Sequence, residues 1–258
     1  MKYIMLFFRF FENSIIKALS FRFDFMMGFL EGFLFFVINY LFFNTFTDQT
    51  STLLQAERMV HISCHQIFTG FFFGLFIDNL SGLSYYINRG DLDYLLVKPI
   101  NSLFILSLRH INIGHIFSTI AVFPLLFVSL RQLQSQITLS MFVMYILSLL
   151  TALVIGYSTL LLFMSLSLLL INIGGVYSLI TTVIDFGKYP SRIFREGAGC
   201  FLITLFPVWL FSEVSKDILI GRAGINKIIQ GMGYGLVFLL IGLVFFRWAI
   251  RKYQSSGS

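Results

Sequence analysis

Charge is scarce in this sequence of 258 residues. Charged side chains make up 12% of it, whereas 57% is hydrophobic and 33 residues are phenylalanine. A typical soluble domain carries about 25% charged residues, so this composition excludes an ordinary soluble protein and indicates the membrane class. The net charge of +6 arises mostly from bases that flank apolar runs. Such bases are expected at cytoplasmic ends of membrane helices and do not indicate nucleic-acid binding.

Cysteines are also few, and the common nucleotide-binding motif is absent. The two cysteines, Cys64 and Cys200, lie far apart in apolar surroundings and give no disulfide framework. The sequence contains no Walker A pattern, so any ATP that the protein uses must be bound by another chain. No catalytic triad order, carboxylate pair or zincin motif supports an enzyme. The N-terminal run lacks a signal-peptide cleavage site, so we expect it to be retained.

The apolar runs predict an all-α integral membrane protein, a single domain with six transmembrane helices of about 20 residues each. Bases precede the first span and follow the last, which places both termini in the cytoplasm and requires an even number of spans. Ile137–Ile184 contains no charged residue and is too long for one span, so we expect it to fold back within Met164–Gly175. The expected spans are 25–46, 59–85, 102–130, 139–164, 168–187 and 228–246.

Two further segments are expected at the membrane surface. In residues 1–20 the polar side chains recur along one helical face, which predicts an amphipathic helix in the headgroup plane; the alternative is the frayed start of the first span. The apolar part of residues 188–213 is too short for a span, so we expect this stretch to form a re-entrant or interfacial segment. Lys188, Arg192 and Arg195 would then carry positive charge on the outer side, against the usual distribution.

An ionisable residue lies near the middle of the first expected span. Burying the carboxylate of Glu31 at that depth in the membrane costs free energy, and ionisable groups there normally face a bundle interior or an aqueous cavity. Asn39 follows eight residues later on roughly the same face. The pair could line a translocation path, or Glu31 could be neutral and hydrogen-bonded between helices.

Histidines form a second group of polar side chains in the expected spans. His61, Cys64 and His65 share one face of the second span, where they could bind a metal with help from His110 or His115, line a pore, or join helices. We expect no bound metal and no cofactor in this chain. The candidate translocation path is Glu31, Asn39, His61, His65 and His110.

Three glycine pairs with the spacing G-x-x-x-G are present: Gly28/Gly32, Gly70/Gly74 and Gly231/Gly235. Such pairs let helix backbones approach closely in lipid. They could form a dimer face or, as we favour, pack helices of the same chain.

The segment 88–100, NRGDLDYLLVKPI, concentrates charge between two spans. Gly90 is expected to end one helix and Asp91 to be the N-cap of the next. Asp93 in the first turn and Lys98 in the last suit the helix dipole, and Pro99 marks the stop.

The leucines of this segment form one apolar stripe. Leu92, Leu95 and Leu96 fall at positions i, i+3 and i+4, which suits docking into a groove on a cytoplasmic partner. The tripeptide Arg89–Asp91 is also a cell-adhesion motif, but adhesion would require an extracellular loop, and the charge distribution places the segment in the cytoplasm.

This segment resembles that of the permeases of type 2 ABC exporters, in a bacterial branch with six spans and an amphipathic N-terminal helix. Tyr189–Phe194 (YPSRIF) and the C-terminal stretch from Trp248 agree with the same branch. The resemblance implies a short cytoplasmic helix that inserts into a cleft of an ATPase. Carried over by position, the coupling residues are Arg89, Gly90, Asp91, Leu92, Asp93, Leu95, Leu96, Lys98 and Pro99.

The function implied is that of a permease subunit in the bacterial inner membrane, which exports an amphipathic small molecule, lipid or peptide by alternating access. The implied partners are cytoplasmic ATPase subunits that hold ATP and Mg, a second identical or different permease, and membrane lipids, but no nucleic acid. An alternative is a proton-coupled secondary transporter that uses Glu31 and the membrane histidines, although two matching halves with broken helices are not evident. A metal- or haem-handling membrane protein, resting only on His61, Cys64 and His65, is a third alternative.

Overall fold

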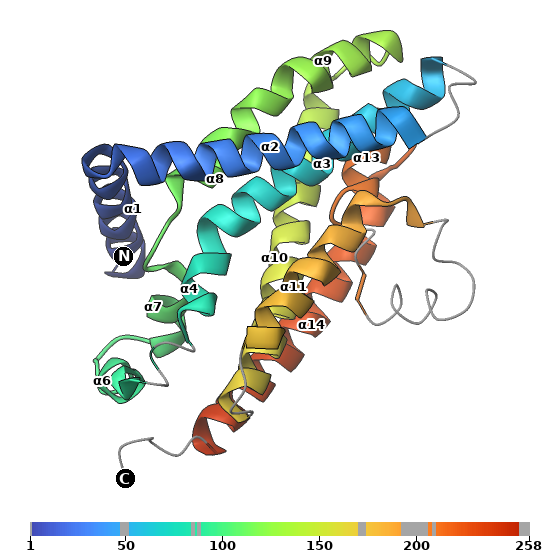
Figure 1. Ribbon diagram of the computed structural model, residues 1–258. Helices are drawn as coiled ribbons and strands as arrows, with labels where there is room; N and C mark the ends of the chain where they lie inside the picture. Colours follow the sequence, from blue (N-terminus) through green and yellow to red (C-terminus); the bar gives the residue numbers. More distant parts are fainter. Residues whose placement is uncertain are drawn as a thin grey trace.

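The computed structural model describes residues 2–46, 52–83, 86, 89–169, 174–191, 206–207 and 210–252. Helices account for most of these residues, and no strand occurs among them (Figure 1). The expectation of an all-α protein is confirmed for this part of the chain.

The amino-terminal helices meet at a sharp corner. α1 (Lys2–Ser20) stands steeply to α2 (Arg22–Phe46) in Figure 1, although the backbone nitrogen of Phe21 still donates to the Lys17 carbonyl at 2.8 Å. Ser14 of α1 is buried against the rest of the molecule, whereas most apolar side chains of α1 are exposed. A membrane-surface position for α1 remains a prediction.

α3 (Thr52–Phe72) is the most enclosed of the long helices. It continues through a π-helical turn, η1 (Phe73–Ile77), into α4 (Asp78–Ser81). The second span therefore starts earlier than the sequence predicts, within the loop expected before Met59.

The helix predicted over residues 102–130 is divided in two. α7 (Ser102–Leu108) is separated by residues 109–112 from α8 (Ile113–Ser118), which continues through η2 (Thr119–Val122) into α9 (Phe123–Gln132). Only Ile113–Gln132 is long and apolar enough to cross a membrane. The division lies at a polar stretch, Arg109–Asn112, whose peptide groups find partners outside regular helix.

The charge-free region folds back, as predicted. α10 (Leu139–Leu169) is followed by α11 (Gly174–Asp185) and η3 (Phe186–Lys188). α13 (Glu213–Leu219) then leads to α14 (Ile225–Lys252), which packs along α10. α11 is about 18 Å long at 1.5 Å per residue, short of the roughly 30 Å of a hydrocarbon core.

Five helices among the described residues are long and apolar enough to span a membrane, against six expected. They are Arg22–Phe42, Leu53–Ile77, Ile113–Gln132, Leu139–Leu166 and Ile225–Lys252. The remaining expected span, 168–187, corresponds to the short α11.

Two groups of helices make up the body of the molecule (Figure 1). α2, α3 and α8–α9 pack together, as do α10, α11 and α14, and contacts of α3 with α10 and α13 join the groups. α1, α6 (Asp91–Leu96) and the end of α14 lie toward one side, and α13 lies toward the other.

All three G-x-x-x-G pairs pack helices within the chain. A Cβ at Gly28 or Gly32 would contact Asn112 or Ser118, and one at Gly70 or Gly74 would contact Thr119 or Ile116. The third pair faces α10: a Cβ at Gly231 would contact Thr151, and one at Gly235 would contact Ile155.

Gly114→Ala should destabilise the protein because α2 and α8 touch through their backbones at this point. A Cβ there would lie 2.9 Å from the Phe25 carbonyl oxygen and 3.0 Å from the Phe29 nitrogen. Overpacking of this kind typically costs about 1–3 kcal/mol. We expect a lower thermal midpoint for the purified variant in detergent.

Gly233→Ala is the matched control, because a Cβ at this position of α14 meets nothing within 4 Å. Alanine is the better helix former by up to about 1 kcal/mol, so this variant should be at least as stable as the wild type. Equal destabilisation by both substitutions would contradict the close α2–α8 contact.

Candidate functional site

The predicted coupling segment is a short helix that follows a left-handed glycine. α6 covers Asp91–Leu96, and its N-cap is Gly90, at φ 74°. Glycine adopts this conformation without steric cost, so the chain can turn immediately before the helix. Asp91, predicted as the N-cap, is instead the first helical residue. Its charge still lies in the first turn, where the helix dipole favours it.

The leucine stripe of α6 faces the protein interior. Leu92 is fully buried and Leu95 is 3% exposed, both in the main hydrophobic cluster, and Leu96 packs against that cluster. This corrects the prediction that the stripe meets a partner. A helix of six residues is not stable alone, so its apolar face is used to attach it to the rest of the chain.

The opposite face of α6 is exposed and was missed in the sequence. Tyr94 is 73% exposed and Val97 is 83% exposed, with Asp91 and Pro99 exposed beside them. The Lys98 ammonium lies 4.9 Å from the centre of the Tyr94 ring, a cation–π contact that holds both side chains together. We call Asp91, Tyr94, Val97, Lys98 and Pro99 the α6 outer face. The helical spacing that puts the leucines on one face of α6 also puts Tyr94 and Val97 on the opposite face, so this signal was present in the sequence.

α7 connects α6 to the membrane helices and to α1. The Asn101 side-chain oxygen accepts a hydrogen bond from the Leu103 nitrogen at 2.9 Å and caps α7. The Phe104 ring lies 5.1 Å from that of Tyr3 and 6.3 Å from that of Phe10, between ring centres. A movement of α6 that displaces α7 would therefore displace α1 as well.

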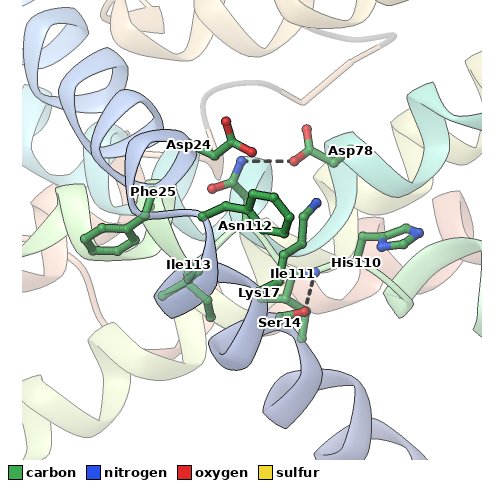
Figure 2. A pocket seen from close by; sticks show the side chains of 12 residues that line it. Ser14, Lys17, Asp24, Phe25, Asp78, His110, Ile111, Asn112 and Ile113 are labelled. Carbon is green, nitrogen blue, oxygen red and sulfur yellow. Dashed lines mark hydrogen bonds between the residues drawn. The ribbon is translucent and has the colours of Figure 1, made fainter.

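The break between α7 and α8 is held by side chains from other helices (Figure 2). The Asn79 side-chain oxygen accepts from the His110 nitrogen at 2.7 Å, and its amide nitrogen donates to the His110 carbonyl. Ser14 Oγ on α1 accepts from the Ile111 nitrogen at 3.1 Å. Buried peptide groups outside regular helix need such partners.

Asn112 completes the break on the α8 side. Its backbone nitrogen donates to the Gly74 carbonyl at 2.8 Å, and its amide nitrogen donates to Asp78 Oδ2 at 3.0 Å. Its side-chain oxygen accepts from the His115 nitrogen at 3.4 Å and caps α8. We call the residues of the break and their side-chain partners the polar joint: Ser14, Asp78, Asn79, His110, Ile111 and Asn112.

His110 belongs to this joint and not to a path with the other histidines. Figure 2 shows it beside a cavity of about 100 Å³ that Ser14 and Asp78 also line. Burial, Arg109 and Lys17 lower the pKa of His110, and Asp78 opposes them. The side chain is therefore neutral at pH 7.

Glu31 lies on the surface of α2, with its side chain 74% exposed and its Oε2 atom 3.8 Å from His115 Nε2. A small cavity of about 60 Å³ between α2, α3 and α8 lies beside it, lined also by Gln66 and Ser118. Gln66 Nε2 donates to the Gly32 carbonyl at 3.1 Å. No local pattern in the sequence distinguishes His115 from the other histidines as the neighbour of Glu31.

The remaining predicted path residues lie apart from Glu31. Asn39 donates to the Phe35 carbonyl of its own helix at 2.8 Å. His61 and His65 are buried on α3, where His61 Nε2 is 3.3 Å from Ser212 Oγ. The part of the chain that the structure describes contains no cluster of three or more His, Cys, Asp or Glu suited to a metal ion.

A charged cavity of about 400 Å³ lies at the end of the molecule where α13 meets α3. The Arg222 guanidinium donates to both carboxylate oxygens of Glu57, with Nη1 2.9 Å from Oε2. Asp217 Oδ2 accepts from Lys227 Nζ at 3.1 Å, and Asp217 Oδ1 lies 3.1 Å from Lys216 Nζ. No local pattern pairs Glu57 with a residue 165 positions away, so the sequence could not reveal this cluster.

Lys188 lies in the same cavity and has local partners for its charge. Its Nζ atom is 3.7 Å from Asp185 Oδ2 and 5.6 Å from the centre of the Phe35 ring. Arg192 and Arg195 lie outside the described residues.

Residues 33–257 match the family model of the ABC-2 family transporter protein. The match includes α6, residues 109–112 and the charged cavity, and it begins within α2. Neither curated proteins nor solved structures give a match.

Asp217→Asn should make the stability of the protein less sensitive to acid. Burial raises the pKa of Asp217, but Lys216 and Lys227 outweigh it and hold the pKa below its ordinary value. The ionised form therefore stabilises the fold above about pH 4, and this contribution disappears as the pH falls from there through the lowered pKa. The thermal midpoint should fall less between about pH 6 and about pH 3 in the variant than in the wild type.

Glu12→Gln serves as the control, because Glu12 is an exposed carboxylate of α1. Its acid response should match that of the wild type. If both variants flatten the response equally, the effect would be general to carboxylates and the assignment to Asp217 would fail.

Proposed function

The chain belongs to the ABC-2 family of transporter proteins, the membrane permease components of type 2 ABC transporters, and from this we propose that it is the permease subunit of an ATP-driven exporter. The main support for the proposal is the way in which α6 is attached to the molecule. Its leucines are anchored in the hydrophobic cluster while Tyr94 and Val97 project from the molecule. An anchored helix with an exposed apolar and charged face suits insertion into a cleft of a partner.

The partner is proposed to be a cytoplasmic ABC ATPase that holds ATP and Mg. The permease family is not itself catalytic, and the sequence carries no Walker A pattern. Closure of the ATPase around nucleotide would press on the α6 outer face. Because Leu92 and Leu95 fix α6 to the core, the force passes to α7 and the polar joint instead of bending α6 away.

The proposed topology places α6 and both termini in the cytoplasm of a bacterial cell, with the helices in the inner membrane. Because only five described helices are long enough to span, this topology requires α11 to belong to a sixth crossing. α1, α6 and the end of α14 lie toward the same side of the molecule (Figure 1). Lys17, Arg251 and Lys252 give that side positive charge near the first and last spans, as the positive-inside rule expects of a cytoplasmic side. The charged cavity places further bases on the other side: Lys188, Lys216, Arg222 and Lys227.

The proposed translocation path passes Glu31. This side chain is exposed within the Arg22–Phe42 span, and an ionisable group facing lipid is costly. We therefore infer that this surface of α2 faces an aqueous path or a second permease subunit. An amphipathic small molecule, a lipid or a peptide is the proposed class of substrate.

A proton-coupled transporter remains the second candidate, because Glu31 and His115 lie 3.8 Å apart and such pairs serve in proton relays. Family membership does not favour it. A secondary transporter would require a proton gradient and no ATPase, so stable association with an ATPase separates the two.

Tyr94→Asp combined with Val97→Asp should abolish association with the ATPase without unfolding the permease. Burying a carboxylate in an apolar cleft is costly, whereas both positions are exposed in the free chain. The measurement is co-purification from membranes after co-expression with an ABC ATPase from a neighbouring reading frame. The permease alone should not hydrolyse ATP.

Ile137→Asp is a matched control, because Ile137 is an exposed apolar residue between α9 and α10. That variant should retain the ATPase. Leu92→Asp should instead lower the amount of folded permease, since it puts a charge into the core. Retention of the ATPase by the Tyr94/Val97 variant would refute the coupling assignment.

A further inference from the structure

A further cavity, of about 290 Å³, lies between the start of α7 and the last turns of α14. Its apolar walls are formed by Leu103 on α7 and by Leu243, Phe246 and Ile250 on α14. Phe246 is buried and belongs to the main hydrophobic cluster. The cavity thus reaches the main hydrophobic cluster of the protein, and it is large enough for part of a lipid molecule.

The rim of this cavity is polar and basic. Arg247 and Arg251 line it from α14, and Asn101 and Ser102 line it from the start of α7. The two arginines are four residues apart, so they share one face of the helix. Both are exposed, and neither forms an ion pair with a carboxylate among the described residues. Their positive charge is available to a ligand.

Neighbouring aromatic residues place this rim at the membrane surface. Trp248 is half-exposed and stacks on Phe245, with ring centres 5.5 Å apart. Tryptophan is enriched where hydrocarbon meets headgroups. Arg247 and Arg251 flank this position, while Leu243 lies a helical turn deeper. The cavity therefore presents cations at headgroup level and apolar walls toward the hydrocarbon.

We propose that this cavity binds an acidic phospholipid, with the phosphate between Arg247 and Arg251 and the start of the acyl chains against the apolar walls. Guanidinium groups bind phosphate through paired hydrogen bonds, and basic pockets between membrane helices on the cytoplasmic side suit acidic headgroups. A free phosphate would use only the rim and leave the walls empty. The site does not depend on the transport assignment.

Occupation of this cavity would link the coupling segment to the last membrane helix. Asn101 caps α7 and lies five residues after the end of α6, whereas both arginines belong to α14. A lipid that contacts both sides restricts their relative movement. The content of acidic lipid in the surrounding membrane thereby sets how firmly α6 is held.

The test uses the full chain purified in a neutral detergent, with its thermal midpoint measured against added lipid. Phosphatidylglycerol at saturation should raise the midpoint by about 5 °C, whereas phosphatidylcholine and inorganic phosphate should not. Arg251→Gln should weaken the apparent affinity for phosphatidylglycerol by about tenfold, and the double variant with Arg247→Gln by more.

Two further variants separate this site from general charge attraction. Lys252→Gln removes the same charge one residue away, outside the cavity lining, and should respond to phosphatidylglycerol like the wild type. Ile250→Trp fills the cavity without removing an arginine and should lose the response. The proposal is overturned if phosphatidylcholine or phosphate alone gives the same shift, or if Lys252→Gln weakens binding as much as Arg251→Gln.

Discussion

Peptide groups inside a membrane protein must find partners within the protein, and residues 109–112 meet this requirement outside regular helix. The side chains of Asn79 and Ser14 and the Gly74 carbonyl serve the peptide groups of the break. Leaving one such buried group unpaired costs about 1–3 kcal/mol. These hydrogen bonds therefore fix α1, α4 and α8 together and direct α7 out of the membrane body toward α6.

α3, with its continuation through η1 and α4, extends from the charged cavity to the polar joint. Near the start of α3, Glu57 binds Arg222 at the charged cavity. At the other end, α4 supplies Asn79 to the polar joint, and the Gly74 carbonyl of η1 accepts from the Asn112 nitrogen. α3 is also the most enclosed long helix. A displacement that reaches the joint from α6 can thus pass along a single, well-packed helix to the opposite side, where charged residues hold α13 and the start of α14.

Local sequence predicts the all-α fold, the fold-back between α10 and α11 and the short helix after Gly90. Hydropathy predicts the first two, whereas Gly90 and Pro99 mark the two ends of the short helix. The prediction that the leucine stripe meets a partner was wrong, because periodicity identifies an apolar face but does not show what packs against it. The break at 109–112 had a signal, since Arg109, His110 and Asn112 interrupt the apolar run. The Glu31–His115 and Glu57–Arg222 contacts join distant residues, and a single sequence contains no pattern that pairs them.

The contact between Ser14 and the Ile111 nitrogen spans 97 residues. α1 is synthesised before the backbone group that it binds and before the Phe104 ring that packs on Tyr3 and Phe10, and two spans lie between them in the sequence. α1 can consequently reach its final place only after α2 and α3 have been made.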